Sequence, residues 1–405
     1  MKVLLINPNR FKSPPVPPIG LEHLAASLEM AGHDAYILDL CFSREPIADL
    51  DKAMVSFHPE VVGVTVRNVD TVLFRTNEFF LDEIREIIEY VKSRYEVKVI
   101  IGGTGVSANP EEILKYMNAD YAVCGPAEDV INEVLDKIRF PEKTAPVRRS
   151  EYRYDIFCPR KLGKIDYGKY YDLGGVAGFE THKGCGSSCV YCLEANSLVS
   201  FKDYRDVIDE IRSIVDSGYN RFHLCDSEFN EDLDYCIDFC SALQNADLHI
   251  DWALYMKPVN YSKKLLHLMK KTGVSLIKLT VDSWKKCPLY YTDIEKIIFM
   301  AKSCGLNIVV DFLTGFPYED EDTLKRYLDM FRRVQPDSVG INTYLRLYKS
   351  LQITKVIVGD PELRRNLIGN TGNDAFIKPV FYNHVSTERL NELIAGDRMF
   401  RIQGL

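Results

Sequence analysis

Three of the eleven cysteines stand close together, at Cys185, Cys189 and Cys192. Their spacing is C-x3-C-x2-C within one predicted loop. Three thiolates at this spacing can bind three irons of a [4Fe–4S] cube and leave the fourth iron open. A structural zinc ion usually takes four ligands from two paired elements, and His182 is the neighbour that could extend the set. The spacing therefore favours an iron–sulfur cluster over zinc.

The other cysteines are scattered and lie mostly in apolar stretches. An odd number of cysteines in a reducing compartment argues for metal ligation or redox chemistry before disulfides. We expect the scattered ones to be buried as small hydrophobic side chains. They are Cys41, Cys124, Cys158, Cys225, Cys236, Cys240, Cys287 and Cys304.

Length and composition limit the class of protein. A chain of 405 residues is long enough for two domains and an appendage. The net charge of −8 argues against a nucleic-acid binder. No apolar run approaches the roughly 18 residues of a membrane span, and the first ten residues lack the apolar core of a signal peptide. We therefore expect a cytoplasmic protein with neither a nucleic acid nor a membrane as partner.

Residues 1–138 alternate between apolar strands and amphipathic helices. The predicted strands are Lys2 to Asn7, Ala35 to Leu40, Val61 to Val66, Val97 to Ile101 and Tyr121 to Val123. The predicted helices are Ile19 to Met30, Pro46 to Phe57, Leu81 to Ser93, Pro110 to Met117 and Glu128 to Ile138. Five such units with nearly all-apolar strands indicate a parallel sheet covered on both faces. The fold class is α/β, a doubly wound domain of flavodoxin type whose ligands bind at the carboxyl ends of its strands.

The loops after the third, fourth and fifth strands carry the informative side chains. Glycines there allow a flat or bulky ligand to approach the backbone, although each one could merely end a strand. No G-x-G-x-x-G follows the first strand, so a classical dinucleotide site is not expected. The candidate ligand-binding residues are Thr65, Arg67, Asn68, Asp70, Gly102, Gly103, Thr104, Gly125 and Glu128.

This half of the chain resembles the cobalamin-binding domain. The resemblance includes the Pro17-Pro18-Ile19-Gly20-Leu21 start of the first helix and the Gly102-Gly103 strand end, which makes Gly20 a further candidate. The D-x-H-x-x-G motif that supplies a histidine below cobalt is missing, so the resemblance is to the subgroup without that ligand. It implies Arg67 near the lower corrin face, where a protonated guanidinium cannot donate a lone pair. The alternative is that Arg67 pairs with Asp70 on a loop.

An aromatic connector is predicted at residues 139–175. Three prolines interrupt it, and its periodicity fails. Its aromatic residues distinguish it from a solvated linker, so we expect it to pack across a domain interface. Among them are Tyr152, Tyr154, Phe157, Tyr167, Tyr170 and Tyr171.

From residue 176 to residue 342 the strand–helix rhythm resumes. After a first strand at Gly178 to Thr181, strands are predicted at Phe222 to Cys225, Ile250 to Leu254, Leu276 to Thr280, Ile308 to Phe312 and Ser338 to Ile341. Five helices alternate with them, which makes six repeats. The pattern predicts a partial (β/α)6 barrel whose site lies at the carboxyl-end loops.

The three-cysteine motif, with the aromatic Tyr191 before its last cysteine, is similar to that of the radical S-adenosylmethionine enzymes. The resemblance covers roughly residues 176–348. It implies that the open iron chelates the methionine part of the nucleotide and that the Tyr191 backbone approaches adenine. It also implies roles in nucleotide binding for residues at successive strand ends. These are Asp226, Ser227, Glu228, Asp282, Ser283 and Gly315.

The C-terminal segment, residues 343–405, begins with Tyr344-Leu345-Arg346-Leu347-Tyr348. Alternation would place Tyr344, Arg346 and Tyr348 on one face, where they become candidate catalytic or substrate-positioning residues. The alternative is a solvated edge with Arg346 in a surface ion pair. The remainder is predicted as a small mixed segment with a helix at Ser386 to Ile394.

The two halves together resemble the cobalamin-dependent, class B radical S-adenosylmethionine methyltransferases. The resemblance implies three cofactors: a [4Fe–4S] cluster, S-adenosylmethionine and methylcobalamin. It implies that a deoxyadenosyl radical abstracts hydrogen from an unactivated sp3 carbon, which then takes the methyl group of methylcobalamin. In size and architecture the chain looks like the glutamine C-methyltransferase that modifies methyl-coenzyme M reductase. This resemblance implies a role in methanogenesis. The predicted substrate is a protein or peptide, such as the alpha chain of that reductase. A small antibiotic or lipid precursor is the alternative substrate. The predicted reductant is a ferredoxin or flavodoxin.

Other functions stay open at this point. A methylthiotransferase would need a second cluster, and Cys41, Cys124 and Cys158 lack suitable spacing. A radical enzyme that uses cobalamin for rearrangement or ring formation cannot be distinguished by sequence. A non-enzymatic cobalamin sensor is disfavoured by the three-cysteine loop.

Overall fold

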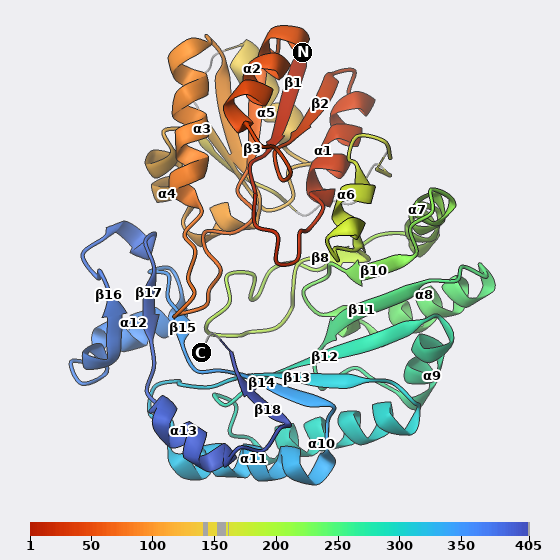
Figure 1. Ribbon diagram of the computed structural model, residues 1–405, viewed down its shortest axis with the longest axis vertical. Helices are drawn as coiled ribbons and strands as arrows, with labels where there is room; N and C mark the ends of the chain where they lie inside the picture. The colour runs from red at the N-terminus through yellow and green to blue at the C-terminus, as the bar shows by residue number, and fades with distance from the viewer. Residues whose placement is uncertain (141–144, 152–158, 161, 404–405) are drawn as a thin grey trace.

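The computed structural model describes residues 1–140, 145–151, 159–160 and 162–403. Figure 1 shows an N-terminal α/β domain above a curved, open barrel, with a small third sheet at one side. The predicted aromatic positions Tyr152, Tyr154 and Phe157, and also Cys158, lie outside the described residues. Within those residues, no helix has both the length and the apolar character needed to cross a bilayer.

Six parallel strands form the N-terminal sheet, in the order β2-β1-β3-β4-β5-β6. The strands are β1 (Lys2–Asn7), β2 (Asp34–Asp39), β3 (Val61–Thr65), β4 (Lys98–Gly102), β5 (Tyr121–Cys124) and β6 (Val147–Arg149). The helices are α1 (Ile19–Met30), α2 (Pro46–Phe57), α3 (Leu81–Arg94), α4 (Pro110–Met117) and α5 (Ile131–Arg139). The predicted doubly wound fold is confirmed, and β6 extends the sheet beyond the five predicted strands.

Alternation along β1 assigns its side chains to two separate cores. Val3 and Leu5 pack with α1 and α5, in a core that continues into the barrel. Leu4 and Ile6 pack with α2, α3 and α4, in a core that continues into the C-terminal segment. Both faces of the sheet are therefore covered, and each face is tied to a different part of the chain.

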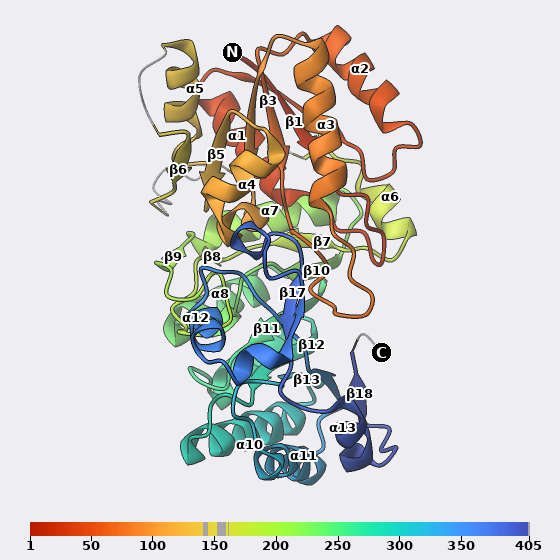
Figure 2. The ribbon, with the colours of Figure 1, turned by 90° about the vertical axis from the view of Figure 1, so that its left-hand side faces the viewer.

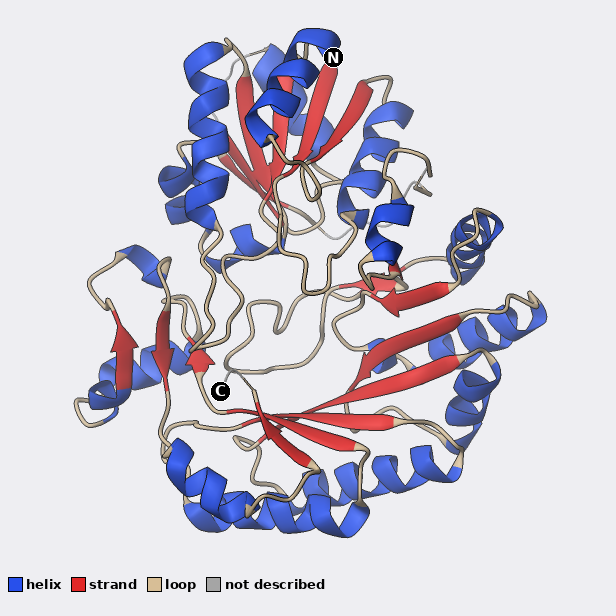
Figure 3. Ribbon diagram, in the orientation of Figure 1, coloured by secondary structure: helices blue, strands red, loops and turns tan. Residues whose placement is uncertain are grey.

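The barrel sheet has seven parallel strands in the order β18-β14-β13-β12-β11-β10-β7. The strands are β7 (Ala177–Phe179), β10 (Arg221–Leu224), β11 (Asp251–Met256), β12 (Val274–Asp282), β13 (Ile308–Leu313), β14 (Ser338–Asn342) and β18 (Phe400–Ile402). The helices are α7 (Tyr204–Asp216), α8 (Leu233–Asn245), α9 (Lys263–Lys271), α10 (Pro288–Ser303), α11 (Glu321–Val334) and α13 (Thr387–Ile394). Figure 3 shows these helices on the outer side of the curved sheet, which leaves its inner side toward the N-terminal domain.

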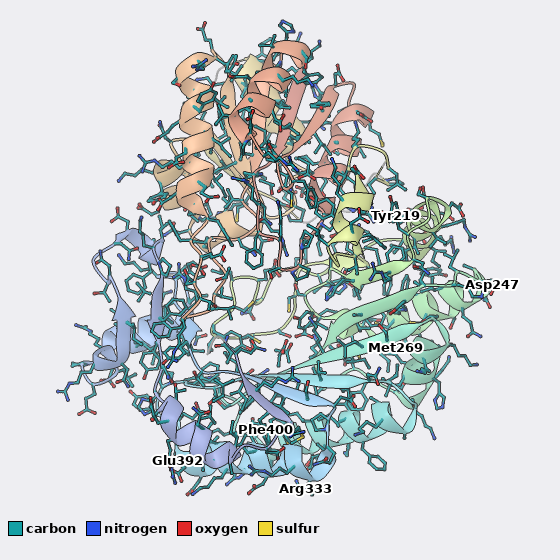
Figure 4. The ribbon with its side chains drawn as sticks, viewed as in Figure 1. Tyr219, Asp247, Met269, Arg333, Glu392 and Phe400 are labelled. Atoms are coloured by element: carbon teal, nitrogen blue, oxygen red, sulfur yellow. The ribbon has the colours of Figure 1, made fainter. Side chains whose placement is uncertain are left out.

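The chain end returns to the barrel. Val339 of β14 pairs with Phe400 of β18, which is labelled in Figure 4. The Phe400 ring lies under the Arg332 guanidinium of α11. The predicted sixth strand is therefore followed by a seventh. The predicted domain boundary at residue 342 lies between β14 and β18 in the sequence, although both strands belong to the barrel sheet.

Between these barrel strands the C-terminal segment forms a small antiparallel sheet. Its strands are β15 (Leu345–Arg346), β17 (Val380–Tyr382) and β16 (Leu367–Gly369), in that order, with α12 (Gln352–Gly359) beside them. Ser350 Oγ donates to the Ala108 carbonyl, which ties this sheet to the N-terminal domain. In the side view the sheet and α12 lie below α4 and next to the barrel (Figure 2).

The described part of the connector contains α6 (Tyr167–Asp172). Its two buried tyrosines contact the N-terminal domain. Tyr167 Oη donates to Glu22 Oε2 over 2.6 Å, and Tyr170 Oη donates to Asp39 Oδ2 over 2.7 Å. These residues of the connector pack across the domain interface, as their aromatic character predicts.

Candidate active site between two sheets

The three cysteines lie on one loop at the carboxyl end of β7. This cysteine loop, residues 184–199, is closed by the antiparallel strands β8 (His182–Lys183) and β9 (Ser200–Phe201). The Cys185 amide donates to Ser197 Oγ over 2.8 Å, and the Ser197 amide donates back to the Cys185 carbonyl over 3.1 Å. The first cysteine is thus fixed at the base of the loop by backbone contacts.

Gly184 is required immediately before that cysteine. Its φ is +83°, and a Cβ atom placed there would collide with the Leu198 carbonyl oxygen. Both facts demand glycine, because other residues are strained at positive φ and would need the loop to open. The motif thus extends one residue beyond the three cysteines that spacing alone identified.

Burial disfavours the thiolate form of all three cysteines. All three are free, with Cys185 buried, Cys189 half-buried and Cys192 exposed. Desolvation raises the pKa of Cys185 and Cys189. Desolvation also raises the pKa of Cys192 to about 11, and the other two thiols add to that rise. A cation such as iron, when bound, would compensate the charge of the thiolates and favour their formation.

The donor set fits a cube better than a single ion. Among the described residues, no three His, Cys, Asp or Glu side chains converge as one metal ion would require. A cube demands less, because each of its three cysteines binds a different iron. His182, the neighbour that could have completed a zinc site, is buried with its Nδ1 3.2 Å from Asp226 Oδ2. The residues present fit a [4Fe–4S] cluster held by three thiolates.

Glu228, after β10, has an unpartnered carboxylate oxygen. Its Oε2 is buried and has no hydrogen-bond partner among the described residues. Burial raises its pKa to about 7, and the Thr280 hydroxyl on β12 opposes the rise. A buried acceptor of this kind fits the ammonium group of a nucleotide-bound methionine, the role that the family resemblance implied.

Its two neighbours are engaged by protein groups. Asp226 accepts from the amide and hydroxyl of Thr181 and from the His182 amide. Ser227 Oγ donates to Glu194 Oε2 over 2.6 Å. Both therefore brace the ends of the cysteine loop, which indicates an indirect role in nucleotide binding.

The ends of β12 and β13 carry the remaining candidates. Asp282 and Ser283 are both buried, and burial raises the pKa of Asp282 while Lys285 opposes the rise. Tyr191 Oη lies 3.4 Å from Asp282 Oδ2, so the cysteine loop contacts this strand end directly.

At the neighbouring strand end, Gly315 has a φ of +88°. Its amide and that of Phe316 donate to Glu319 Oε2. The Phe316 ring lies 5.5 Å from the Tyr191 ring. Predicted residues from three strand ends therefore surround the cysteine loop.

Sequence reasoning missed a charged pair beside Cys185. Glu231 Oε1 lies 3.5 Å from Cys185 Sγ and 2.7 Å from Lys257 Nζ. Lys257 follows β11, far along the chain from the loop, so no local motif connects these residues. The pair lies next to the first predicted cluster ligand, where it contributes to the local field.

The predicted cobalamin residues gather at the lower edge of the N-terminal sheet. Thr65 and Gly102 are register partners at the ends of β3 and β4. Gly103 has a φ of +101°, and an added Cβ would lie 2.8 Å from the Val66 carbonyl oxygen. Gly125 likewise has a positive φ. These glycines let the strand ends and their loops approach one another closely, together with Thr104 and Asn68 at the same edge.

Arg67 extends from this edge toward the barrel. Its side chain is exposed in the folded chain, and its guanidinium interacts electrostatically with Cys225 of the barrel and Tyr170 of α6. Glu128, at the same edge, interacts with Lys183 of β8. Gly20 lies in the first turn of α1, next to Ile19, whose side chain contacts Gly178 of β7. The predicted cobalamin edge therefore faces the barrel.

The alternative pairing of Arg67 with Asp70 is wrong. Asp70 Oδ2 accepts from Arg346 Nε over 2.7 Å, and both side chains are buried. The rest of the Arg346 guanidinium donates to backbone carbonyls of Leu347, Phe376 and Ile377. Arg346 therefore joins the loop after β3 to the C-terminal segment. Because this ion pair is buried, the alternative of a surface ion pair for Arg346 is also wrong.

The two predicted tyrosines contact the same part of the molecule. Tyr348 is buried beneath Arg346, with the guanidinium carbon 4.2 Å from its ring centroid, and burial raises its pKa. Tyr344 stacks on Phe74 at 4.1 Å. Phe74 and Asp70 belong to one loop, residues 66–80, so the three candidates for catalysis hold that loop in place.

A buried cluster of ionisable groups joins the two domains, and no local motif predicts it. Glu180, directly after β7, lies 2.7 Å from both Lys183 and Lys202. Lys183 and Lys202 hold the Glu180 pKa well below its ordinary value despite burial. His23 of α1 lies 3.7 Å from Glu180, and burial lowers its pKa.

The connector contributes Arg160 to this cluster. Its guanidinium lies 2.5 Å from Glu210 of α7 and 3.4 Å from Glu22 of α1. The cluster therefore includes groups from the N-terminal domain, the connector and the barrel. Such a network fixes the base of the cysteine loop relative to the cobalamin edge.

Two family models match the two halves of the chain. The B12 binding domain matches residues 13–135, and the Radical SAM superfamily matches residues 179–331. The first range covers the N-terminal sheet up to α5, and the second runs from β7 into α11. The comparison thus assigns the predicted domains to these two families.

Curated relatives span both domains. A tryptophan 2-C-methyltransferase of Streptomyces laurentii is 24% identical, over 92% of this chain and 77% of its own length. A cytidylyl-2-hydroxyethylphosphonate methyltransferase of Streptomyces wedmorensis is 22% identical, over 78% of this chain and 73% of its own length.

One solved structure has the same arrangement of domains. The radical S-adenosylmethionine methyltransferase TsrM from Kitasatospora setae, with cobalamin and a [4Fe–4S] cluster bound, aligns with a TM-score of 0.86 at 23% identity. The alignment covers 99% of this chain and 92% of that one. The cluster, S-adenosylmethionine and cobalamin that the two families call for fit the residues described above. The chain therefore contains a B12-binding domain followed by a domain of the Radical SAM superfamily, and it has the same fold as that methyltransferase.

Proposed function

We propose that this protein is a cobalamin-dependent radical S-adenosylmethionine enzyme that transfers a methyl group to carbon. Relatives that align over both domains are named as methyltransferases. The proposal rests on one observation, namely that the cobalamin edge and the cysteine loop face each other. The cobalamin edge, with Arg67, faces the strand ends of the barrel, and the cysteine loop lies at those same ends.

Each group of residues has a defined part in this scheme. When bound, the cluster and nucleotide supply a deoxyadenosyl radical, and the corrinoid supplies the methyl group. The three cysteines hold three irons, and Glu228 and Asp282 are positioned to bind polar groups of the nucleotide. Arg67 would lie beside a bound corrinoid, and its protonated guanidinium has no lone pair to offer cobalt.

The type of carbon is the narrower part of the proposal. We assign an unactivated sp3 carbon, which has no lone pair for direct attack on a sulfonium methyl. Carbon 2 of an indole ring, the position in one relative's name, is instead an sp2 carbon. Methylation of an sp3 carbon and methylation of an sp2 carbon convert S-adenosylmethionine to different products. Counting those products therefore distinguishes the two cases.

Product counting tests the assignment. Reconstituted, anaerobic protein is incubated with substrate and methyl-labelled S-adenosylmethionine. At an sp3 carbon, each labelled product should accompany one 5′-deoxyadenosine and one S-adenosylhomocysteine. Labelled product with S-adenosylhomocysteine alone would mean direct transfer to a nucleophilic carbon.

The same incubation tests two alternatives. A product without label would indicate a radical enzyme that uses cobalamin for rearrangement or ring formation. Fewer than about three irons per chain after reconstitution, without nucleotide cleavage, would indicate a cobalamin sensor. A ferredoxin or flavodoxin is the proposed reductant, and a chemical reductant serves as its control.

If the substrate is a macromolecule, we propose that it is a protein or peptide. The narrowest candidate, a glutamine in the alpha chain of methyl-coenzyme M reductase, is supported by chain size and domain architecture. Incubation of that subunit, in unmethylated form, should place label on one glutamine. Label on a small molecule and none on the subunit would exclude it.

A further inference from the structure

The inner face of the barrel carries a row of polar side chains on four neighbouring strands. On each strand alternate residues face the outer helices and are fully buried, as Trp252 and Ile277 are. The residues between them face inward and are only half-buried. Four polar members of this inner face form the row: His223 on β10, Tyr255 on β11, Lys278 on β12 and Asp311 on β13.

These side chains contact one another. Tyr255 and Lys278 are register partners, and the Lys278 ammonium lies 3.4 Å from the Tyr255 hydroxyl and 5.0 Å from its ring centroid. The His223 ring lies 5.8 Å from the Tyr255 ring. The Asp311 carboxylate interacts with the Tyr255 hydroxyl and accepts from Gln403 Nε2 over 3.5 Å. Tyr255 thus stands between a cation and an anion.

The two charges are close but do not pair. Lys278 is the register partner of Val309, and Asp311 lies two residues further along β13. Such diagonal neighbours are roughly 7–8 Å apart at Cα. Among the described residues, neither Lys278 nor Asp311 has an ion-pair partner within 4.0 Å. Half-buried charges of opposite sign on one face, neither of them in a direct ion pair, match a ligand that carries both signs.

We propose that this row binds a free proteinogenic α-amino acid, with Lys278 on its carboxylate and Asp311 on its ammonium group. The inference rests on the proposed methyl-transfer function and names its substrate class. A residue inside a peptide has neither charge, so the row selects the free amino acid. Tyr255 then fills the space between the two groups.

The row lies within reach of both cofactor sites. Lys278 precedes Asp282 by four residues, which is roughly 13 Å along a strand. Thr280 lies between them and contacts Glu228. On the other side, His223 interacts with Arg67 of the cobalamin edge. An amino acid anchored by its charged groups at the row can extend its side chain toward the strand ends, where the methyl group is to be delivered.

The test begins with wild-type holoenzyme. It is reconstituted with cluster and cobalamin, reduced, and given deuteromethyl S-adenosylmethionine with an equimolar mixture of the twenty free L-amino acids. We expect one amino acid to gain the label. Its N-acetyl and carboxamide derivatives should be poorer substrates by about tenfold to a hundredfold in kcat/KM, because each lacks one charged contact.

Variants assign each contact. Lys278→Met should raise the KM for the free acid by about tenfold to a hundredfold and abolish discrimination against the carboxamide. Asp311→Asn should do the same for the N-acetyl derivative. Lys264→Met, on an exposed position of α9, is the matched control and should keep wild-type kinetics. Iron content and corrinoid absorbance equal to wild type show that a variant is folded.

The outcomes separate this inference from the proposed function. If label reaches the bound corrinoid but no amino acid, the row does not bind this class, and the methyl-transfer proposal stands. If the derivatives react as well as the parent acid in wild type, the inference is overturned even when a variant fails to fold. If no label reaches the corrinoid, the proposed function fails and this inference fails with it.

Discussion

Replacing Arg346 with methionine should loosen the joint between the N-terminal domain and the C-terminal segment without affecting the barrel. The substitution keeps an apolar stem of similar length and removes the guanidinium. It leaves the Asp70 carboxylate, which is fully buried, without its cation. It also removes the donors for three backbone carbonyls.

The expected cost follows from burial of the pair. Breaking one partner of a buried ion pair costs about 3–5 kcal/mol, because an uncompensated charge remains. At about 1.4 kcal/mol per factor of ten, local opening should become about a hundredfold to several thousandfold more frequent. Two amides report on it directly. Phe80 donates to the Val69 carbonyl in the loop, and Leu347 donates to the Val380 carbonyl in the small sheet.

Hydrogen exchange measured by mass spectrometry or NMR provides the assay. Amides of β11 and β12 are the internal control and should keep their wild-type rates. The double variant Arg346→Met/Asp70→Leu, which removes both charges, should recover at least half of the lost protection. If the amides of Phe80 and Leu347 exchange at wild-type rates while the methylated product is lost, Arg346 does not stabilise this contact between domains. That result would support a catalytic role for Arg346.

Three further predictions concern the cofactor sites. Replacing all three cysteines of the cysteine loop with alanine should abolish iron binding and deoxyadenosine formation, while cobalamin should still bind. Iron analysis and absorbance spectra measure these effects. Nucleotide cleavage in that variant would contradict the cluster assignment. Gly184→Ala should lower iron content severalfold, because its Cβ would collide with the Leu198 carbonyl, and unchanged iron would mean that the loop relaxes at little cost. Affinity for S-adenosylmethionine should fall about tenfold per pH unit below pH 7, because protonation of Glu228, whose pKa is about 7, removes the charge that faces an ammonium group. Glu228→Gln should bind more weakly with no such pH dependence, and a parallel pH profile in both proteins would place the titrating group elsewhere.

Local periodicity predicted most of the fold. The bounds of α1, α2 and α4 agree with prediction residue for residue, because each of these helices has an apolar face with a clear start and stop. Strands of five or six apolar residues were found for the same reason. The short strands β15, β16, β17 and β18 have two or three residues each, too few for any period, and the return of β18 to the barrel was missed.

The candidate site divides in a similar way. Three thiolates that bind one cluster must lie close together, so their short spacing in sequence was sufficient evidence. The partner of Arg346 is 276 residues distant, and alternation along a predicted strand could not reveal it. The same holds for Glu231 and Lys257 beside Cys185, and for the inner-face row, which exists only when four strands lie side by side.

Local sequence patterns were enough to predict the two domain types, their order and the three cysteines proposed as cluster ligands, since each depends on residues near one another in the chain. Which charged groups meet became visible only in the folded chain. Asp70 binds Arg346 rather than Arg67, and Lys278 faces Asp311 without pairing. Burial makes such pairings strong and selective, because a charge removed from water depends on whichever partner the fold brings within a few ångströms.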